Sequence, residues 1–267
     1  MYIEVEVCRF EREDGCVMLP TLLSVALLGQ SALTAPTNLI ILVHGLYGGD
    51  NNLRVLRDTL QILGHGSVVV VSSGSNIGKT RDGVMKGGLR LVDEIRDAVQ
   101  RHPSLQTISM VGNSLGGLYV RYAAGILLEK DGTMAGLTPD ALVTIGCPHL
   151  GVRKFTFIPL PSALHELGWI VAGRTADDLL LRTPVLGEMA REGSRFHEAL
   201  RAFRRRRLYA NLKGDFMVPF GTAAIQARGW GHGIGDDLRA ACFADRADAI
   251  FVDQQARGGT EKRERDT

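Results

Sequence analysis

One pentapeptide of this chain has the residue types and the spacing of a nucleophilic serine site. Gly112-Asn113-Ser114-Leu115-Gly116 matches the pattern G-x-S-x-G, in which glycines allow the tight turn that exposes a serine hydroxyl. Such a serine attacks a carbonyl carbon, and the N–H of the next residue, Leu115, would help to hold the oxyanion that forms. The same residues could instead be a glycine-rich helix start with a capping serine, so the neighbouring elements must decide.

The residues around the motif predict a strand before it and a helix after it. Thr107 to Val111 is typical of a buried strand, and a helix is predicted from about Leu115 to Leu128. A nucleophilic turn of this type requires a strand that runs directly into a helix. This context favours a nucleophile over a capping residue.

A second motif, His44-Gly45-Leu46-Tyr47-Gly48-Gly49, directly follows the apolar run Asn38–Val43. An ester hydrolase needs a second backbone N–H for its oxyanion hole, and loops with an H-G sequence after an early strand supply it. We expect Leu46 to be this donor, together with Leu115. His44 is expected to orient the loop rather than to act as a base.

The pattern of the whole chain predicts an α/β protein with a mostly parallel sheet and helices on both faces. Helices are predicted over a segment containing Leu53, Leu56 and Leu60, over Leu89 to Val99, and over Val185 to Arg204. Further strands are predicted at Tyr2–Val7, Val68–Val71, Ala141–Ile145, Leu208–Leu212 and Ala249–Val252.

Composition and charge exclude several classes of protein. The chain has 267 residues, 45% of them hydrophobic, and a formal net charge of +2, which does not fit a protein that wraps nucleic acid. Its four cysteines (Cys8, Cys16, Cys147 and Cys242) form no C-x-x-C pair, so neither a zinc site nor a disulfide scaffold is predicted. Ser72 to Lys79 resembles a phosphate-binding loop only in composition. We expect no metal and no organic cofactor.

Several motifs in consistent order, over about residues 38 to 226, resemble the serine esterases, a lipase-like branch of the α/β hydrolases found in plants, fungi and protists. The matching stretches are Leu42–Gly48, Gly112–Leu118, Cys147–Val152, Gly173-Arg174-Thr175, and Tyr209-Ala210-Asn211 followed by Asp215, Met217 and Val218. The resemblance implies an α/β-hydrolase fold with a cap insertion and hydrolysis of a lipid-like ester through an acyl-serine. Two features differ from the family: Asn113 stands where histidine is usual, and the resemblance fades after Gln226.

The remaining triad residues are expected after Ser114, because the chain order in this fold is Ser, acid, His. Asp215 follows the predicted strand Leu208–Leu212 and is the expected acid, with a turn-forming Gly-Asp as the alternative. His232 is the only histidine after Asp215 and is therefore the expected base, with a solvated loop histidine as the alternative. His149 is expected to be structural.

The domain organisation predicted from the sequence has three parts. Residues 1–36 form an N-terminal extension, residues 37–253 form the hydrolase domain with a cap at about 150–200, and residues 254–267 form a disordered charged tail. The apolar stretch Phe155–Val171 is expected either to serve as a lid or acyl-chain wall or to pack in the core.

One apolar and one basic segment suggest where in the cell the protein is located. The apolar run Val17–Leu28 follows an acidic stretch, which does not fit a cleaved signal, so a cytoplasmic protein is predicted. That run and the arginines at 201 and 204–207 are candidate contacts for weak association with membrane surfaces, although arginines at a helix end usually pair with its carbonyls. Two other functions remain open: an inactive lipid- or protein-binding module, and an acyltransferase with the same triad.

Overall fold

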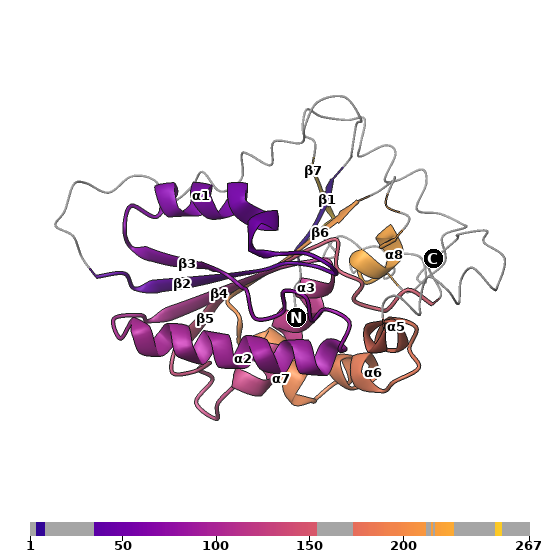
Figure 1. The fold of residues 1–267 in the computed structure, drawn as a ribbon. Coiled ribbons are helices and arrows are strands. Elements are labelled where there is room, and N and C mark those ends of the chain that lie inside the picture. Colours follow the sequence, from indigo (N-terminus) through magenta and orange to yellow (C-terminus); the bar gives the residue numbers. More distant parts are fainter. Residues whose placement is uncertain are drawn as a thin grey trace, which may run out of the picture.

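The structure, a computed structural model, describes residues 4–8, 35–153, 173–211, 215, 217–226 and 249–252. Its centre is a sheet with the strand order β3-β2-β4-β5-β6-β1-β7 (Figure 1). All neighbouring strands are parallel except β1 and β7, which pair antiparallel. The strands are β1 (Glu4–Cys8), β2 (Asn38–Val43), β3 (Val68–Ser72), β4 (Thr107–Asn113), β5 (Thr138–Ile145), β6 (Arg205–Asn211) and β7 (Ala249–Val252). The α/β class and the mostly parallel sheet predicted from the sequence are confirmed.

Helices cover both faces of this sheet. In Figure 1, α2, α3 and α7 lie on one face and α1 lies on the other. The helical elements are η2 (Asp50–Leu53), α1 (Arg54–Leu63), α2 (Val84–Arg101), α3 (Leu115–Leu127), α5 (Arg174–Leu179), α6 (Val185–Ala190), α7 (Arg195–Ala202) and α8 (Phe220–Ala223). A parallel sheet needs this double cover because both of its faces are apolar.

The prediction of one helix over Val185–Arg204 is wrong, because the segment forms two helices, α6 and α7. α6 ends at Ala190 because Arg191 is extended, with ψ 127°, and Gly193 then adopts the left-handed conformation, with φ +73°. The hydroxyl of Ser194 then accepts the His197 N–H at 3.2 Å and caps the new helix. The glycine and the serine together turn the chain, although the apolar spacing continues through them.

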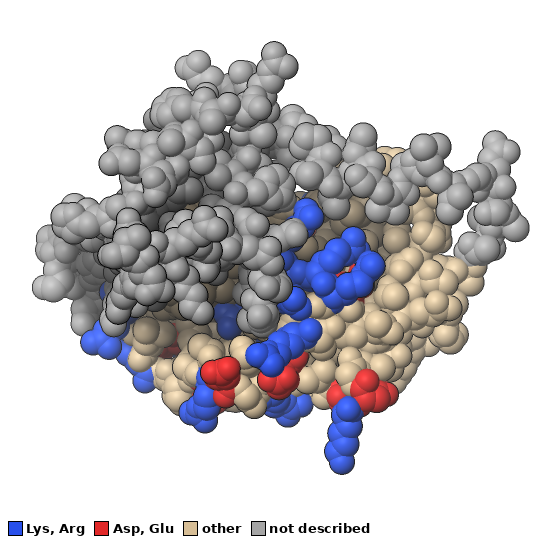
Figure 2. All heavy atoms as spheres, turned by 180° about the vertical axis from the view of Figure 1, so that it is seen from behind, with Lys and Arg blue, Asp and Glu red and all other residues tan. Residues whose placement is uncertain are grey.

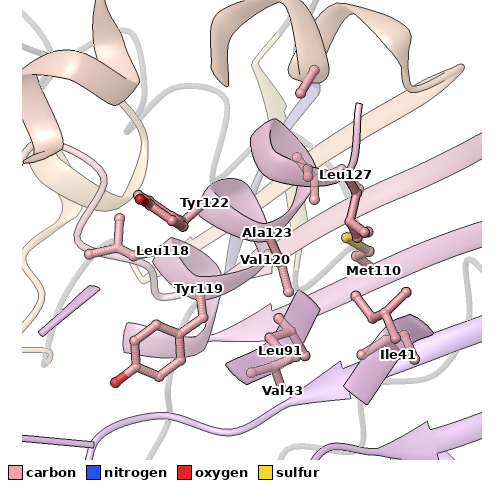
Figure 3. Close-up of a cluster of buried hydrophobic side chains, with 14 of the residues drawn as sticks. Ile41, Val43, Leu91, Met110, Leu118, Tyr119, Val120, Tyr122, Ala123 and Leu127 are labelled. Carbon is pink, nitrogen blue, oxygen red and sulfur yellow. The ribbon is translucent and has the colours of Figure 1, made fainter. Parts of the chain in front are cut away.

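The main core lies between the sheet and the face formed by α2 and α3 (Figure 3). Ile41 and Val43 of β2 and Leu91 of α2 are fully buried there. Two glycines of α2 let α3 approach closely, since a Cβ on Gly87 would lie 2.2 Å from the ring of Tyr119. This packing fixes α3, and therefore the residue that precedes it, against the end of the sheet.

Some predicted features fall on parts of the chain that the structure does not describe. These are the apolar runs Val17–Leu28 and Phe155–Val171, and the charged tail 254–267. Of the predicted cap at about 150–200, residues 154–172 are not described. The strand β1, within the predicted extension, lies in the sheet between β6 and β7.

Candidate active site

Ser114 occupies the turn between β4 and α3 in a conformation that serines rarely adopt. Its φ is +51° and its ψ is −124°, which is a strained region for a residue with a side chain. The Ser114 N–H donates to the carbonyl of Ile145 at 2.7 Å, which ties the turn to the end of β5. The strand, the strained serine and the helix start follow one another directly, which is the order that a nucleophilic serine turn requires.

The two glycines of the pentapeptide are required by close backbone contacts. A Cβ on Gly112 would lie 2.5 Å from the carbonyl oxygen of Gly116, and a Cβ on Gly116 would lie 2.3 Å from the carbonyl oxygen of Val43. Both distances are far shorter than real contacts of a Cβ atom allow. The glycines therefore let the helix start of α3 touch the end of β2, which places the Ser114 turn beside the loop that follows β2.

That loop passes directly over the serine. A Cβ on Gly45 would lie 2.9 Å from the Ser114 Cβ and 3.4 Å from the Ser114 Oγ. The backbone of the His44–Gly49 loop therefore lies against the serine side chain at Gly45. An ester carbonyl bound at Ser114 would meet the amides of this loop.

The amides that follow Leu46 in this loop are engaged in hydrogen bonds. The Tyr47 N–H donates to the Oγ1 of Thr80 at 3.1 Å, and the Gly48 N–H donates to the carbonyl of Gly45 at 3.0 Å. The Nδ1–H of the buried His44 donates to that same carbonyl at 2.9 Å. Within the described part of the chain, the Leu46 N–H has no such partner. Leu115 is the first residue of α3, where a backbone N–H has no partner in the helix.

Asp215 lies just beyond the end of β6. Its Oδ1 accepts the N–H groups of Met217 at 3.1 Å and Val218 at 2.8 Å. Its Oδ2 lies 3.3 Å from the side-chain nitrogen of Asn211. The carboxylate thus closes a turn of its own, and its orientation is fixed by three donors.

Ser114 and Asp215 flank the same two residues at the end of β5. The serine N–H is bonded to the carbonyl of Ile145, and a Cβ on Gly146 would lie 3.9 Å from the Asp215 Oδ2. The strands that carry them, β4 and β6, are the two neighbours of β5. An imidazole placed above this dipeptide would lie between the hydroxyl and the carboxylate.

His149 is held in a buried network. Its Nδ1 accepts from the guanidinium of Arg121 at 2.9 Å, and its Nε2–H therefore donates to the Oγ1 of Thr144, also at 2.9 Å. Burial, and then the positive charge of Arg121, lower the pKa of His149 well below 6.5. Burial also raises the pKa of the adjacent Cys147 thiol to about 12. Both ring nitrogens of His149 are occupied by structural contacts.

A small cavity of about 20 Å³ adjoins this network rather than the serine. Arg121, Thr144 and His149 contribute to its lining, and its size suits a single water molecule. In the ranges described here, no group of three or more His, Cys, Asp or Glu side chains is placed to hold a metal ion.

The arginines predicted as a membrane contact lie at the opposite end of the sheet from Ser114. Arg206 donates to the carbonyls of Leu200 at 3.1 Å and Arg201 at 3.3 Å, so it pairs with the end of α7. Arg204 and Arg205 form ion pairs with Asp140. Figure 2 shows the face opposite to that of Figure 1, where basic side chains lie next to acidic ones. Arg205 and Arg206 start β6, whereas Ser114 follows the end of the parallel β4.

The structure places four of the five predicted site residues. Ser114, Leu115 and Leu46 come together at the carboxyl ends of β2 and β4, and Asp215 lies two strands away from β4. His232, the predicted base, falls in a stretch that the structure does not describe. Arg121 was not predicted as a structural or site residue, although it is the one charged residue in an otherwise uncharged helix, Leu115–Leu127. Thr80 was not predicted either, because no local sequence signal marks it.

A mostly parallel sheet with a strained serine directly after an inner strand, β4, and an acid after β6, two strands away, is typical of the α/β-hydrolase fold. Comparison with known families is consistent with this. The chain belongs to the family described as "Putative serine esterase", whose model matches residues 34–227.

Curated relatives are much longer than the region they share with this chain. "Putative lipase C4A8.10" of Schizosaccharomyces pombe is 31% identical over 73% of this chain, which corresponds to 27% of that protein. "Putative lipase ROG1" of Saccharomyces cerevisiae is 29% identical over 70% of this chain and 28% of its own length. Among solved structures, Est1E from Butyrivibrio proteoclasticus has a TM-score of 0.45 and 17% identity, over 72% of this chain and 74% of that one. The match to Est1E is too weak to support a functional conclusion.

Proposed function

We propose that this protein hydrolyses a carboxylic ester, with a lipid ester as the substrate, through an acyl-serine intermediate. The observation that carries the proposal is the strained Ser114, at φ +51°, next to the backbone of the loop at Gly45. A serine held in this way has no evident structural benefit that would offset its strain, which costs about 1–3 kcal/mol. The lipid part of the proposal is supported by the names of the two yeast relatives.

In the proposed reaction, the Ser114 Oγ attacks the ester carbonyl carbon while the base takes the hydroxyl proton. The N–H groups of Leu46 and Leu115 hold the oxyanion, and each such donor lowers the barrier by about 3 kcal/mol. The protonated base then gives its proton to the departing alcohol, which leaves an acyl group on the serine. Water, activated by the same base, releases the acid and restores the hydroxyl.

We assign the base to His232 and its orienting partner to Asp215. The position of Asp215 beside Gly146 supports this assignment, because an imidazole there could reach both the carboxylate and Ser114. His149 is a poor alternative, since both of its ring nitrogens are already engaged.

Turnover of p-nitrophenyl esters of different acyl length tests the hydrolase function. Ser114→Ala should abolish turnover, whereas Ser109→Ala, a matched change within β4, should leave it intact. No turnover by the wild type would instead support an inactive binding module, and undiminished turnover in Ser114→Ala would remove Ser114 from the mechanism. Product analysis with an added alcohol would reveal acyl transfer, if esters of that alcohol form faster than the free acid.

Weak association with membrane surfaces is a separate proposal. No described helix is long and apolar enough to cross a membrane. Arg204 and Arg205 could not bring Ser114 to a bilayer, because they lie at the other end of the sheet. Exposed apolar side chains beside the site, Tyr47 and Met217, are better placed. Absence of co-sedimentation with anionic liposomes at low salt would contradict this proposal.

A further inference from the structure

The loop between β3 and α2 carries a residue that holds the oxyanion loop. Thr80, which is 2% exposed, accepts the Tyr47 N–H through its Oγ1 at 3.1 Å. This is the next amide after Leu46, the proposed oxyanion donor. Because adjacent peptide units share one Cα, a shift of the Tyr47 amide also turns the Leu46 peptide.

Thr80 is itself held from two other elements. Its carbonyl accepts the hydroxyl of Thr175 on α5 at 2.6 Å and the hydroxyl of Tyr119 on α3 at 3.3 Å. Thr175 is fully buried, and its Oγ1 also accepts the Gly83 N–H at 3.0 Å. The position of Thr80 is therefore determined by helices on both sides of it.

Two glycines let α5 approach the Thr80 loop. A Cβ on Gly173 would lie 2.9 Å from the carbonyl oxygen of Arg81, and a Cβ on Gly83 would lie 2.9 Å from the Asp178 Oδ2. Asp178 in turn accepts the Val84 N–H at 2.6 Å. The segment Gly173-Arg174-Thr175, one of the motifs that the sequence analysis singled out, thus packs against this loop.

The rest of the loop is also fixed. Arg90 donates to the Asn76 Oδ1 at 3.1 Å and to the Lys79 carbonyl at 3.3 Å, and it forms an ion pair with Asp82. The side-chain nitrogen of the fully buried Asn76 donates to the carbonyl of Gly87 at 2.9 Å. A loop held to α2 by this many hydrogen bonds can serve as a rigid support.

We propose that Thr80 is a positioning residue for the oxyanion hole, and that Thr175, through the Gly173-Arg174-Thr175 segment, holds Thr80 in place. This inference rests on the ester hydrolase function proposed above. Thr80 touches neither the serine nor the ester, so it acts through the Tyr47 amide. Its loss should raise the barrier to acylation more than it weakens substrate binding, because the oxyanion exists only in the transition state.

The test compares Thr80→Val, Thr80→Ser and Thr175→Val with the wild type. Thr80→Val should slow labelling by a fluorophosphonate and lower kcat by about 10-fold or more, up to the roughly 100- to 1,000-fold cost of losing an oxyanion donor. KM should change little, and Thr80→Ser, which keeps the hydroxyl, should restore most of the rate. Thr175→Val should also slow fluorophosphonate labelling and lower kcat. Thr107→Val is the matched control, since it removes a 2.7 Å hydroxyl bond to Asn38 at the far end of the sheet.

Hydrogen exchange of the Tyr47 amide provides a readout independent of activity. Exchange should be faster in Thr80→Val than in the wild type and unchanged in Thr107→Val. If Thr80→Val does not fold, as judged by its thermal unfolding transition, Thr80→Ala takes its place. Wild-type rates and wild-type exchange in folded Thr80→Val or Thr80→Ala would overturn the inference. If the wild type shows no esterase activity, the proposed function fails, and the exchange at Tyr47 still shows whether Thr80 holds the loop.

Discussion

Gly45 and Ser114 lie so close that a Cβ on the glycine would stand 2.9 Å from the Cβ of the serine. The first belongs to the loop after β2 and the second to the turn after β4, and these strands are direct neighbours in the sheet. The spacing between the serine and the proposed oxyanion donors is therefore set by backbone contact. A side chain at position 45 would have to push the two loops apart.

Gly45→Ala should lower esterase activity strongly. The methyl group would displace the Leu46 amide or the serine, and a misplacement of about 1 Å can cost about 100-fold in rate. The matched control is Gly187→Ala on α6, where no atom lies within 4 Å of the added carbon. Steady-state kinetics on a soluble ester measure the activity of both variants. An active Gly45→Ala enzyme would show that the loop does not form the oxyanion hole as proposed.

Asp215→Asn should lower kcat by up to about 10⁴-fold, the loss seen when a triad acid is replaced by its amide. The asparagine oxygen can still accept the N–H groups of Met217 and Val218, so the turn should persist and the protein should stay folded. Asp131→Asn is the matched control, because Asp131 accepts the Thr133 N–H in a comparable exposed turn. If both variants retain full activity, Asp215 is only a turn residue.

His232→Ala should abolish turnover if this residue is the base. The wild-type rate should rise with pH, because only the neutral imidazole can take the serine proton. His65→Ala, at an exposed position beside α1, serves as the control. Undiminished turnover in His232→Ala would exclude the residue as the base.

The stability of the fold should fall as the pH drops below about 6.5, and His149 should contribute to this. The folded-state pKa of His149 lies well below 6.5. As the pH falls below 6.5, this side chain therefore becomes protonated in the unfolded chain but stays neutral in the folded one. The free energy of unfolding should decrease by up to about 1.4 kcal/mol per pH unit between 6.5 and the folded-state pKa. Urea unfolding at several pH values measures this slope. The slope should be smaller in His149→Asn and unchanged in His65→Asn; equal slopes in the wild type and His149→Asn would contradict the prediction.

The sequence predicted the elements whose determinants are local. The apolar run Asn38–Val43 and the pentapeptide at Ser114 carry their structure in adjacent residues, and both appear as expected. The break between α6 and α7 was missed because apolar spacing was weighted above the Gly193-Ser194 signal.

Contacts between distant side chains could not be predicted in the same way. Thr80 accepts the Tyr47 N–H although the two residues are 33 positions apart in the sequence. Thr175 donates to the Thr80 carbonyl although these two residues are 95 positions apart. A threonine in a polar loop has no pattern that distinguishes it from its neighbours. Only the packing of α3 and α5 against that loop makes Thr80 a candidate positioning residue.

The central claim, that Ser114 is the nucleophile, is tested most directly by mapping a covalent adduct. The wild-type protein is treated with a fluorophosphonate, digested, and analysed by mass spectrometry of its peptides. The account predicts one phosphonylated residue, Ser114, and no adduct in Ser114→Ala. An adduct on another residue, or equal labelling of the wild type and Ser114→Ala, would contradict it.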